Sequence, residues 1–276
     1  MINTSIIIPV YNCERYIGQA VTSALRQYAS ECPYEIIVVN DGSTDGTRGI
    51  LFDMQRNLPT GAIRIVDQDN GGQAAAENTG ICASRGKNVL FLDADDLLAP
   101  EAIEILATGL KTHSWATGEY SAFSDTTGKH LYTTDKSRFS HIGTREETHP
   151  LLYANISGHP KAFTRREAEI VGGLDASLRV ANDYDLALKI LYPGIDRPFH
   201  YTGRVLYWYR KHPHSLSTLS EQRCNHEGEI ALNRSLRRLG ISKSAHYEGR
   251  NQLGYHSFKL TNHKAIRNDW HTHEYT

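Results

Sequence analysis

Short apolar runs alternate with longer amphipathic runs over the first hundred residues. The apolar runs have the length of strands and cover Ser5–Val10, Tyr34–Asn40, Ala62–Val66 and Asn88–Leu92. The segments between them show helical periodicity and cover Glu14–Tyr28, Thr44–Asn57 and Gln73–Ser84. Strands that alternate with helices of this length favour an α/β fold, with a mostly parallel twisted sheet flanked by helices.

The pattern becomes less regular after Asp96. It predicts a helix near Pro100–Lys111, strands around a Thr-Thr-Gly-Lys turn within Ser114–Thr134, a helix near Tyr184–Leu191 and a β-rich segment at Tyr201–Tyr209. Helical periodicity returns at 220–239. The last 36 residues are polar and hold five of the 14 histidines without close spacing. We expect a C-terminal helical extension and tail over 218–276, not a metal-binding tract.

Composition excludes several classes of protein. The chain has 30 Lys and Arg against 31 Asp and Glu, so it lacks the basic field of a nucleic-acid-binding protein. Its four cysteines are widely spaced, which matches neither a disulfide framework nor a zinc site. No window is long and apolar enough to span a bilayer, and no room for a signal peptide precedes the first strand. We expect a cytoplasmic protein, with a peripheral membrane contact left open and the oligomeric state not indicated.

Polar residues follow each of the four predicted strands, where an open parallel sheet binds its ligands. These strand ends read Pro9-Val10-Tyr11-Asn12, Asn40-Asp41-Gly42-Ser43, Asp67-Gln68-Asp69-Asn70-Gly71-Gly72 and Asp93-Ala94-Asp95-Asp96. The first lacks the G-x-G-x-x-G of a dinucleotide fold, and the chain has no G-x-x-x-x-G-K-[ST] phosphate loop. A Rossmann oxidoreductase and a P-loop ATPase are therefore disfavoured.

The fourth strand end is an acidic cluster made of Asp93, Asp95 and Asp96. Carboxylates this close repel one another unless a cation shares them. Hard oxygen ligands suit Mn²⁺ or Mg²⁺, and either ion can also bind the phosphate oxygens of a substrate. The alternative is an acidic turn in which Asp95 or Asp96 caps the following helix.

Several segments together resemble the family 2 glycosyltransferases of GT-A fold. They are Ser-Ile-Ile-Ile-Pro-Val-Tyr-Asn at 5–12, Glu-Ile-Ile-Val-Val-Asn-Asp-Gly-Ser-Thr-Asp-Gly-Thr at 35–47, Asn-Gly-Gly-Gln-Ala-Ala-Ala-Glu-Asn-Thr-Gly at 70–80 and Phe-Leu-Asp-Ala-Asp-Asp at 91–96. Lys-Ala-Phe-Thr-Arg-Arg-Glu with Gly-Gly-Leu-Asp (161–175), Asn-Asp-Tyr-Asp-Leu-Ala-Leu-Lys (182–189) and Tyr-Arg-Lys-His-Pro-His-Ser-Leu-Ser (209–217) extend the match. The resemblance covers about residues 3–217 and keeps the family's motif order.

The resemblance implies an inverting transfer of sugar from a UDP-sugar to an acceptor hydroxyl. It implies a GT-A domain over 1–217, in which 1–98 binds the nucleotide sugar and 99–217 forms the acceptor side. The residues expected to bind the donor are Pro9, Val10, Tyr11, Asn12, Asp41, Asn70, Gly71, Asp93, Ala94 and Asp96. Among them, Asp41 is expected at the uracil, Asp93 at the ribose and Asp96 toward the donor sugar. Alternatively, Asp41 caps the helix at Thr44–Asn57.

The resemblance also assigns the metal and the base. Asp95 and His212 are the expected ligands of Mn²⁺ or Mg²⁺, with His214 as the competing histidine. Asp183 is the expected general base, at or near a helix N-terminus where the helix dipole favours a charged carboxylate, and Asp185 is the weaker candidate. The alternatives are a structural His212 and a helix-capping Asp183.

Two positions depart from the family pattern, and two rival functions remain open. Glu77 stands where the family usually has arginine, which removes a positive charge near the donor, and Asn182 stands where it usually has glutamate. The rivals are a sugar-nucleotide pyrophosphorylase and a non-catalytic scaffold that binds nucleotide sugar. The acceptor is left open among a growing surface polysaccharide, a lipid-linked glycan, a protein and a small metabolite.

Overall fold

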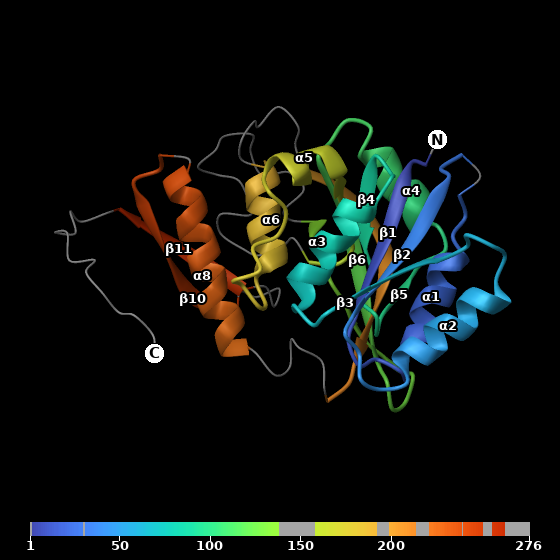
Figure 1. Cartoon of the computed structure of the whole chain (residues 1–276). Coiled ribbons are helices and arrows are strands. Elements are labelled where there is room, and N and C mark those ends of the chain that lie inside the picture. The colour runs from blue at the N-terminus through green and yellow to red at the C-terminus, as the bar shows by residue number, and fades with distance from the viewer. Residues whose placement is uncertain are drawn as a thin grey trace.

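A single sheet with helices on both faces forms the centre of the molecule (Figure 1). The structure is a computed structural model that describes residues 2–29, 31–137, 158–191, 199–213, 221–238, 240–250 and 256–262. Within this part of the chain the strands follow the order β3-β2-β1-β4-β8-β6-β9-β5, and β7 pairs with β6. Their bounds are β1 Thr4–Val10, β2 Tyr34–Asp41, β3 Arg64–Gln68, β4 Asn88–Phe91, β5 Leu97–Leu98, β6 Trp115–Ser124, β7 His130–Thr133, β8 Lys161–Thr164 and β9 Phe199–Lys211.

The sheet is parallel in its N-terminal half and mixed beyond it. Strands β3, β2, β1 and β4 pair in parallel, as the alternation of apolar and amphipathic runs predicted. Strand β8 then runs antiparallel to both β4 and β6, and β9 runs parallel to β6. The mostly parallel arrangement therefore describes the first half only, because β8 is antiparallel to both of its neighbours and β5 is antiparallel to β9.

Helices cover both faces of the sheet. Their bounds are α1 Ile17–Leu25, α2 Thr47–Asn57, α3 Gln73–Ala83, α4 Ala102–Gly109, α5 Arg165–Ile170, α6 Asn182–Leu191 and α8 Glu221–Arg238. Side chains of β1 alternate between two cores, with Ile7 facing α3 and α6 and with Ile6 and Ile8 facing α1 and α4. Both layers are visible on opposite sides of the sheet in Figure 1.

The helices α1 and α2 begin three residues later than predicted. The loops before them bind each other: the side chain of Asn12 accepts from the backbone N–H of Thr44, and that of Glu14 accepts from Gly46. Asp45 accepts from the backbone N–H of Thr47, the first residue of α2. The residues predicted as the first turns of α1 and α2 therefore form the contact between the ends of β1 and β2.

The C-terminal region is a helix and a hairpin packed on α6. The helix α8 is present as predicted, and Ala231, Leu232 and Leu236 share one core with α6 and α3. The tail expected after it instead contains two antiparallel strands, β10 Lys243–Arg250 and β11 His256–Asn262. They were missed because a hairpin that buries one face needs few apolar residues, here chiefly Ala245 and Phe258.

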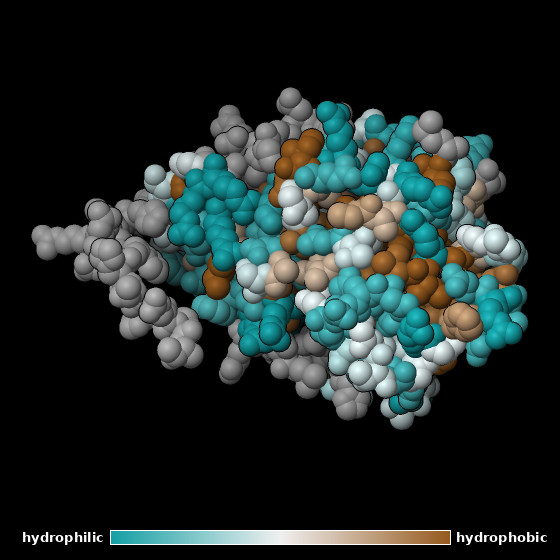
Figure 2. Space-filling model, viewed as in Figure 1, coloured by the Kyte–Doolittle hydropathy of each residue, from teal (hydrophilic) through white to brown (hydrophobic). Residues whose placement is uncertain are grey.

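The outer surface of this region is polar. The side of α8 in view in Figure 2 is hydrophilic, and two of its arginines pair with the main domain, Arg234 with Asp175 at 2.6 Å and Arg238 with Asp185 at 3.3 Å. Among the described residues, no helix has both the length and the apolar character needed to cross a membrane.

Candidate active site

The loops after β1 and β2 are joined through Asn12. This residue has a positive φ of 48°, a conformation that asparagine tolerates better than most side chains. Its backbone N–H donates to Ser43 Oγ at 3.0 Å, and its Oδ1 accepts from the N–H of Thr44 at 2.7 Å. The predicted donor segment Pro9-Val10-Tyr11-Asn12 is thereby held beside the loop that follows Asp41.

The carboxylate of Asp41 organises the turn at Asn70-Gly71-Gly72. Its side chain accepts from the backbone N–H groups of Gly71 at 2.9 Å and Gly72 at 2.8 Å, and from Gln68 Nε2 at 2.7 Å. Gly72 has a φ of +86°, which L side chains rarely adopt. The helix-cap alternative for Asp41 is wrong, because its hydrogen bonds go to this turn and α2 begins only at Thr47.

The acidic cluster follows β4 and is held by Arg210 of β9. The backbone N–H of Arg210 donates to Asp96 Oδ1 at 2.7 Å, and its Nε donates to the carbonyl of Asp95 at 2.7 Å. Asp96 is only 1% exposed, and burial, together with the charges of Asp95 and Asp93, raises its pKa well above the usual value. The arginine of the Tyr-Arg-Lys-His segment, Arg210, therefore holds the Asp95–Asp96 turn in place.

Asp95 and His212 lie in direct contact. His212 Nε2 is 2.8 Å from Asp95 Oδ2, and the imidazole packs against the ring of Tyr16 with centroids 5.0 Å apart. His212 and Arg210 are two residues apart on the chain, and both contact the Asp95–Asp96 turn. Burial and the neighbouring charge of Asp93 raise the pKa of Asp95, while His212 opposes the shift. The structure thus brings together the two predicted metal ligands, and His214 lies outside the described residues.

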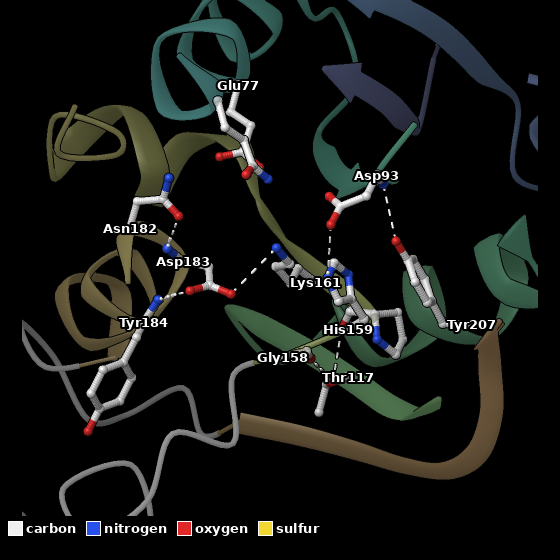
Figure 3. Close-up of polar contacts among 12 residues, drawn as sticks. Glu77, Asp93, Thr117, Gly158, His159, Lys161, Asn182, Asp183, Tyr184 and Tyr207 are labelled. Atoms are coloured by element: carbon white, nitrogen blue, oxygen red, sulfur yellow. Dashed lines mark hydrogen bonds and ion pairs between the residues drawn. The ribbon is translucent and has the colours of Figure 1, made fainter. Parts of the chain in front are cut away.

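A second cluster was not anticipated from the sequence. One ligand-capable atom from each of Asp93, Asp96 and His159 lies within 4.8 Å of the others. His159 Nε2 is 3.2 Å from Asp93 Oδ2, and its ring stacks on Tyr207 with centroids 4.4 Å apart (Figure 3). Burial and the charge of Lys161 lower the pKa of His159, while its contact with Asp93 opposes the shift.

The acidic cluster suits a hydrated divalent cation. Asp93 Oδ1 and Asp96 Oδ2 are buried and have no hydrogen-bond partner among the described residues. In addition, burial and then the like charges of the cluster raise the pKa of both Asp95 and Asp96. Carboxylate oxygens with an imidazole form a ligand set that Mn²⁺ accepts, and Mg²⁺ accepts the carboxylates. The residues present therefore fit such an ion.

Asp183 stands in the first turn of α6, as predicted. Its Oδ1 accepts from the backbone N–H of Tyr184 at 2.7 Å, and its Oδ2 is 3.4 Å from Lys161 Nζ. The side chain is 17% exposed, so it can reach a substrate. Asp185 is fully buried and pairs with Lys189 at 2.6 Å, which agrees with its being the weaker candidate for the base.

Glu77 is a buried carboxyl group close to these charges. It lies on α3 and is fully buried, and its Oε2 has no hydrogen-bond partner among the described residues. Burial raises its pKa to about 8; Asp93 and Asp183 add to this shift and Lys161 opposes it. Glu77 was noted in the sequence only as a departure from the family pattern. Neither its burial nor the proximity of Lys161 can be seen there.

Replacing Glu77 by glutamine should make stability less dependent on pH. The folded carboxyl keeps its proton to about pH 8 and the unfolded one only to about pH 4, so the folded chain binds more protons between these values. Its contribution to stability is therefore present below about pH 4 and lost as the pH rises toward 8. As the pH rises across this window, the free energy of unfolding of Glu77→Gln should therefore increase relative to that of the wild type by on the order of 1–4 kcal/mol.

Thermal unfolding of both proteins from pH 4.5 to 8.5 measures this difference. Glu104→Gln, at an exposed glutamate on α4, is the matched control and should follow the wild-type curve. If the Glu77→Gln and wild-type curves ran parallel across the window, Glu77 would not carry the raised pKa.

Sequence relatives place the chain among sugar transferases. The profile of the family described as glycosyl transferase family 2 matches residues 5–168. The chain is 33% identical over 251 residues to a chondroitin synthase of Escherichia coli, a match that covers 87% of this chain and 33% of that protein. It is 31% identical over 249 residues to a hyaluronan synthase of Pasteurella multocida, covering 86% and 23% respectively. The chain thus spans a third or less of the length of these relatives.

Solved structures show the same fold. S. aureus TarS 1-349 in complex with UDP-GlcNAc superposes with a TM-score of 0.67 at 19% identity, covering 85% of this chain and 66% of that one. The mannosyltransferase PcManGT from Pyrobaculum calidifontis, in complex with GDP-Man and Mn²⁺, superposes with a TM-score of 0.62 at 21% identity. The match covers 86% of this chain and 64% of that one. The motifs, the family profile, the relatives and the fold agree: this chain belongs to glycosyl transferase family 2, a family of sugar-transferring enzymes, and has the GT-A fold.

Proposed function

We propose that the chain transfers a sugar from a UDP-sugar to an acceptor hydroxyl by a single displacement that inverts the anomeric centre. The observation that carries this proposal is the arrangement around Lys161. Its ammonium lies 3.4 Å from Asp183, the proposed base, and interacts electrostatically with Asp93 of the acidic cluster. A carboxylate able to accept a proton therefore faces the same site as the carboxylates suited to a diphosphate-bound cation.

The strand ends would hold the nucleotide. We assign Asp41 to the uracil side of the site. It lies near the end of β1 and the residues that follow it (Pro9, Val10, Tyr11 and Asn12), and it contacts the turn at Asn70 and Gly71. Asp93 and Ala94 are assigned to the ribose. Asp96, whose side chain is buried, is assigned to the inner end of the site near the donor sugar. TarS, which shares the fold, was solved with UDP-GlcNAc, and this supports a UDP-sugar donor.

Asp95 and His212 are the proposed ligands of Mn²⁺ or Mg²⁺. Asp95 has a side chain that is 28% exposed, so it can meet an ion that also contacts substrate and water. When bound, the ion would supply positive charge that stabilises the departing diphosphate. PcManGT was solved with Mn²⁺ and a nucleotide sugar, which supports a divalent ion in this fold.

The proposed acceptor is a growing polysaccharide chain. The relatives that match most of this chain are named as chondroitin and hyaluronan synthases, which supports a glycan hydroxyl as the nucleophile. Asp183 would take the proton from that hydroxyl as the hydroxyl oxygen bonds to the anomeric carbon and the diphosphate leaves.

A donor panel tests this function. UDP-glucose, UDP-galactose, their N-acetylated forms and GDP-mannose are each added with Mn²⁺, and both the shift in melting temperature and the release of nucleoside diphosphate are measured. We expect at least one UDP-sugar to stabilise the chain and to release UDP faster with a glycan acceptor than without it. Binding without any turnover would support the scaffold function, and binding of none of the donors would contradict the proposal.

A further inference from the structure

Lys161 is a buried cation among carboxylates from separate elements. It lies on β8 and is only 3% exposed. Asp183 comes from α6, Asp93 from the loop after β4 and Glu77 from α3, and all act electrostatically on Lys161. Figure 3 shows Lys161 between Asp183 on one side and Asp93 with His159 on the other.

This environment keeps Lys161 charged. Burial alone disfavours an ammonium group, but Asp93, Asp183 and Glu77 outweigh it and raise the pKa of Lys161. A permanently charged group inside the protein acts strongly on nearby carboxylates because little water screens it.

The contact between Lys161 and Asp183 orients the proposed base. Oδ1 of Asp183 is occupied by the backbone N–H of Tyr184 at 2.7 Å, and Oδ2 faces the ammonium of Lys161 at 3.4 Å. The backbone N–H of Asp183 itself donates to Asn182 Oδ1 at 2.7 Å. The carboxylate is therefore oriented from both ends, with a cation on the oxygen that is not bound to the helix.

We propose that Lys161 is a positioning residue for the general base: it holds the Oδ2 side of Asp183 in place while the acceptor hydroxyl approaches. This inference rests on the proposed function, in which Asp183 takes the acceptor proton. Lys161 itself gives up no proton and forms no bond to the substrate.

Another lysine-aspartate pair on the same helix serves as a comparison. Lys189 and Asp185 are 2.6 Å apart, and Arg238 binds the same carboxylate at 3.3 Å. Asp185 is fully buried, so this pair joins α6 to its neighbours and presents no carboxylate to a substrate. The Lys189–Asp185 pair is thus buried, whereas the aspartate of the Lys161–Asp183 pair is partly exposed.

Other charged groups also act on Asp183, and the experiment takes them into account. Lys136 and His159 lie within electrostatic range of it, and so does Glu77 on α3. Within the described part of the chain, Lys161 is the cation that forms an ion pair with Asp183. Replacing Lys161 therefore removes the contact and leaves the more distant charges in place.

The test compares Lys161→Met, Lys161→Arg and Asp183→Asn with the double variant Lys161→Met/Asp183→Asn. We expect Lys161→Met to lower kcat by about 10–100-fold with the donor KM changed less than about threefold, because a misplaced base slows the chemical step and not binding. Lys161→Arg should recover part of kcat, and Lys161→Met should cost nothing further in the Asp183→Asn background.

Lys189→Met is the matched control and should keep the wild-type kcat and donor KM while melting at a lower temperature. Lys161→Met leaves buried carboxylates without a cation in contact and can prevent folding, so Glu77→Gln/Lys161→Met, which also removes one ionisable buried carboxyl group, is measured in parallel. A folded variant of either kind with wild-type kcat would overturn the inference, as would full additivity with Asp183→Asn. Near-normal turnover in Asp183→Asn would instead contradict the proposed base, and with it the proposed function.

Discussion

Replacing Asp183 by asparagine should lower the rate of transfer by about 10²–10⁴-fold while donor affinity stays nearly unchanged. Asparagine keeps the shape of the side chain and its hydrogen bond to the N–H of Tyr184, so α6 should still form. It cannot take a proton from the acceptor. The measurement is kcat and KM with the preferred UDP-sugar and a glycan acceptor, with calorimetry for donor binding.

Asp185→Asn is the control on the same helical turn. Asp185 is fully buried against Lys189 and Arg238, so its replacement should lower the melting temperature and leave kcat per folded molecule unchanged. A folded Asp183→Asn protein that transfers sugar at a near-normal rate would leave Asp183 with no role beyond the first turn of α6.

Replacing Asp95 by alanine should abolish metal-dependent UDP binding without harming the apo fold. Removal of a group behind a metal ligand typically costs 10–100-fold in affinity, so removal of a ligand should cost about 10²-fold or more. Burial and the charge of Asp93 already raise the pKa of Asp95, which means that the cluster is strained by repulsion. The melting temperature without metal should hold or rise. Titration calorimetry of UDP with and without Mn²⁺ measures the binding.

Two histidines distinguish the proposed metal ligands from the second acidic cluster. His212 contacts Asp95, whereas His159 lies with Asp93 and Asp96. If Asp95 and His212 hold the ion, His212→Ala should weaken Mn²⁺-dependent UDP binding more than His159→Ala does. The opposite order, with unchanged affinity in Asp95→Ala, would move the ion to the Asp93, Asp96 and His159 set.

The sequence predicted the parts of the site that lie at regular positions. Apolar runs located the strands, and the polar residues directly after β1, β2 and β4 proved to lie at one edge of the sheet. The apolar residues after Asp183 predicted a helix there, and α6 begins at Asn182. These predictions succeeded because they depend on periodicity within one segment.

Residues that reach the site through long-range pairing were missed. Lys161 begins β8 and His159 lies two residues before it. This four-residue strand pairs antiparallel with β4, and no local pattern shows which strand it joins. The hydrogen bonds of Asp41 to Gly71 and Gly72 were also missed, because these backbone N–H groups lie 30 and 31 residues away along the chain. Side-chain chemistry identifies candidates, but only the tertiary contacts show what each candidate binds.

The pairing of β8 with β4 has a consequence for how such enzymes can be recombined. Lys161 sits opposite Phe91 in this ladder, and Leu97 sits opposite Trp208 where β5 meets β9. A graft that joined residues 1–98 of this chain to the later part of another family member would have to restore the packing between β4 and β8 and between β5 and β9. Exchange of so long a segment should therefore cost more stability than point substitutions in the loops that follow the strands.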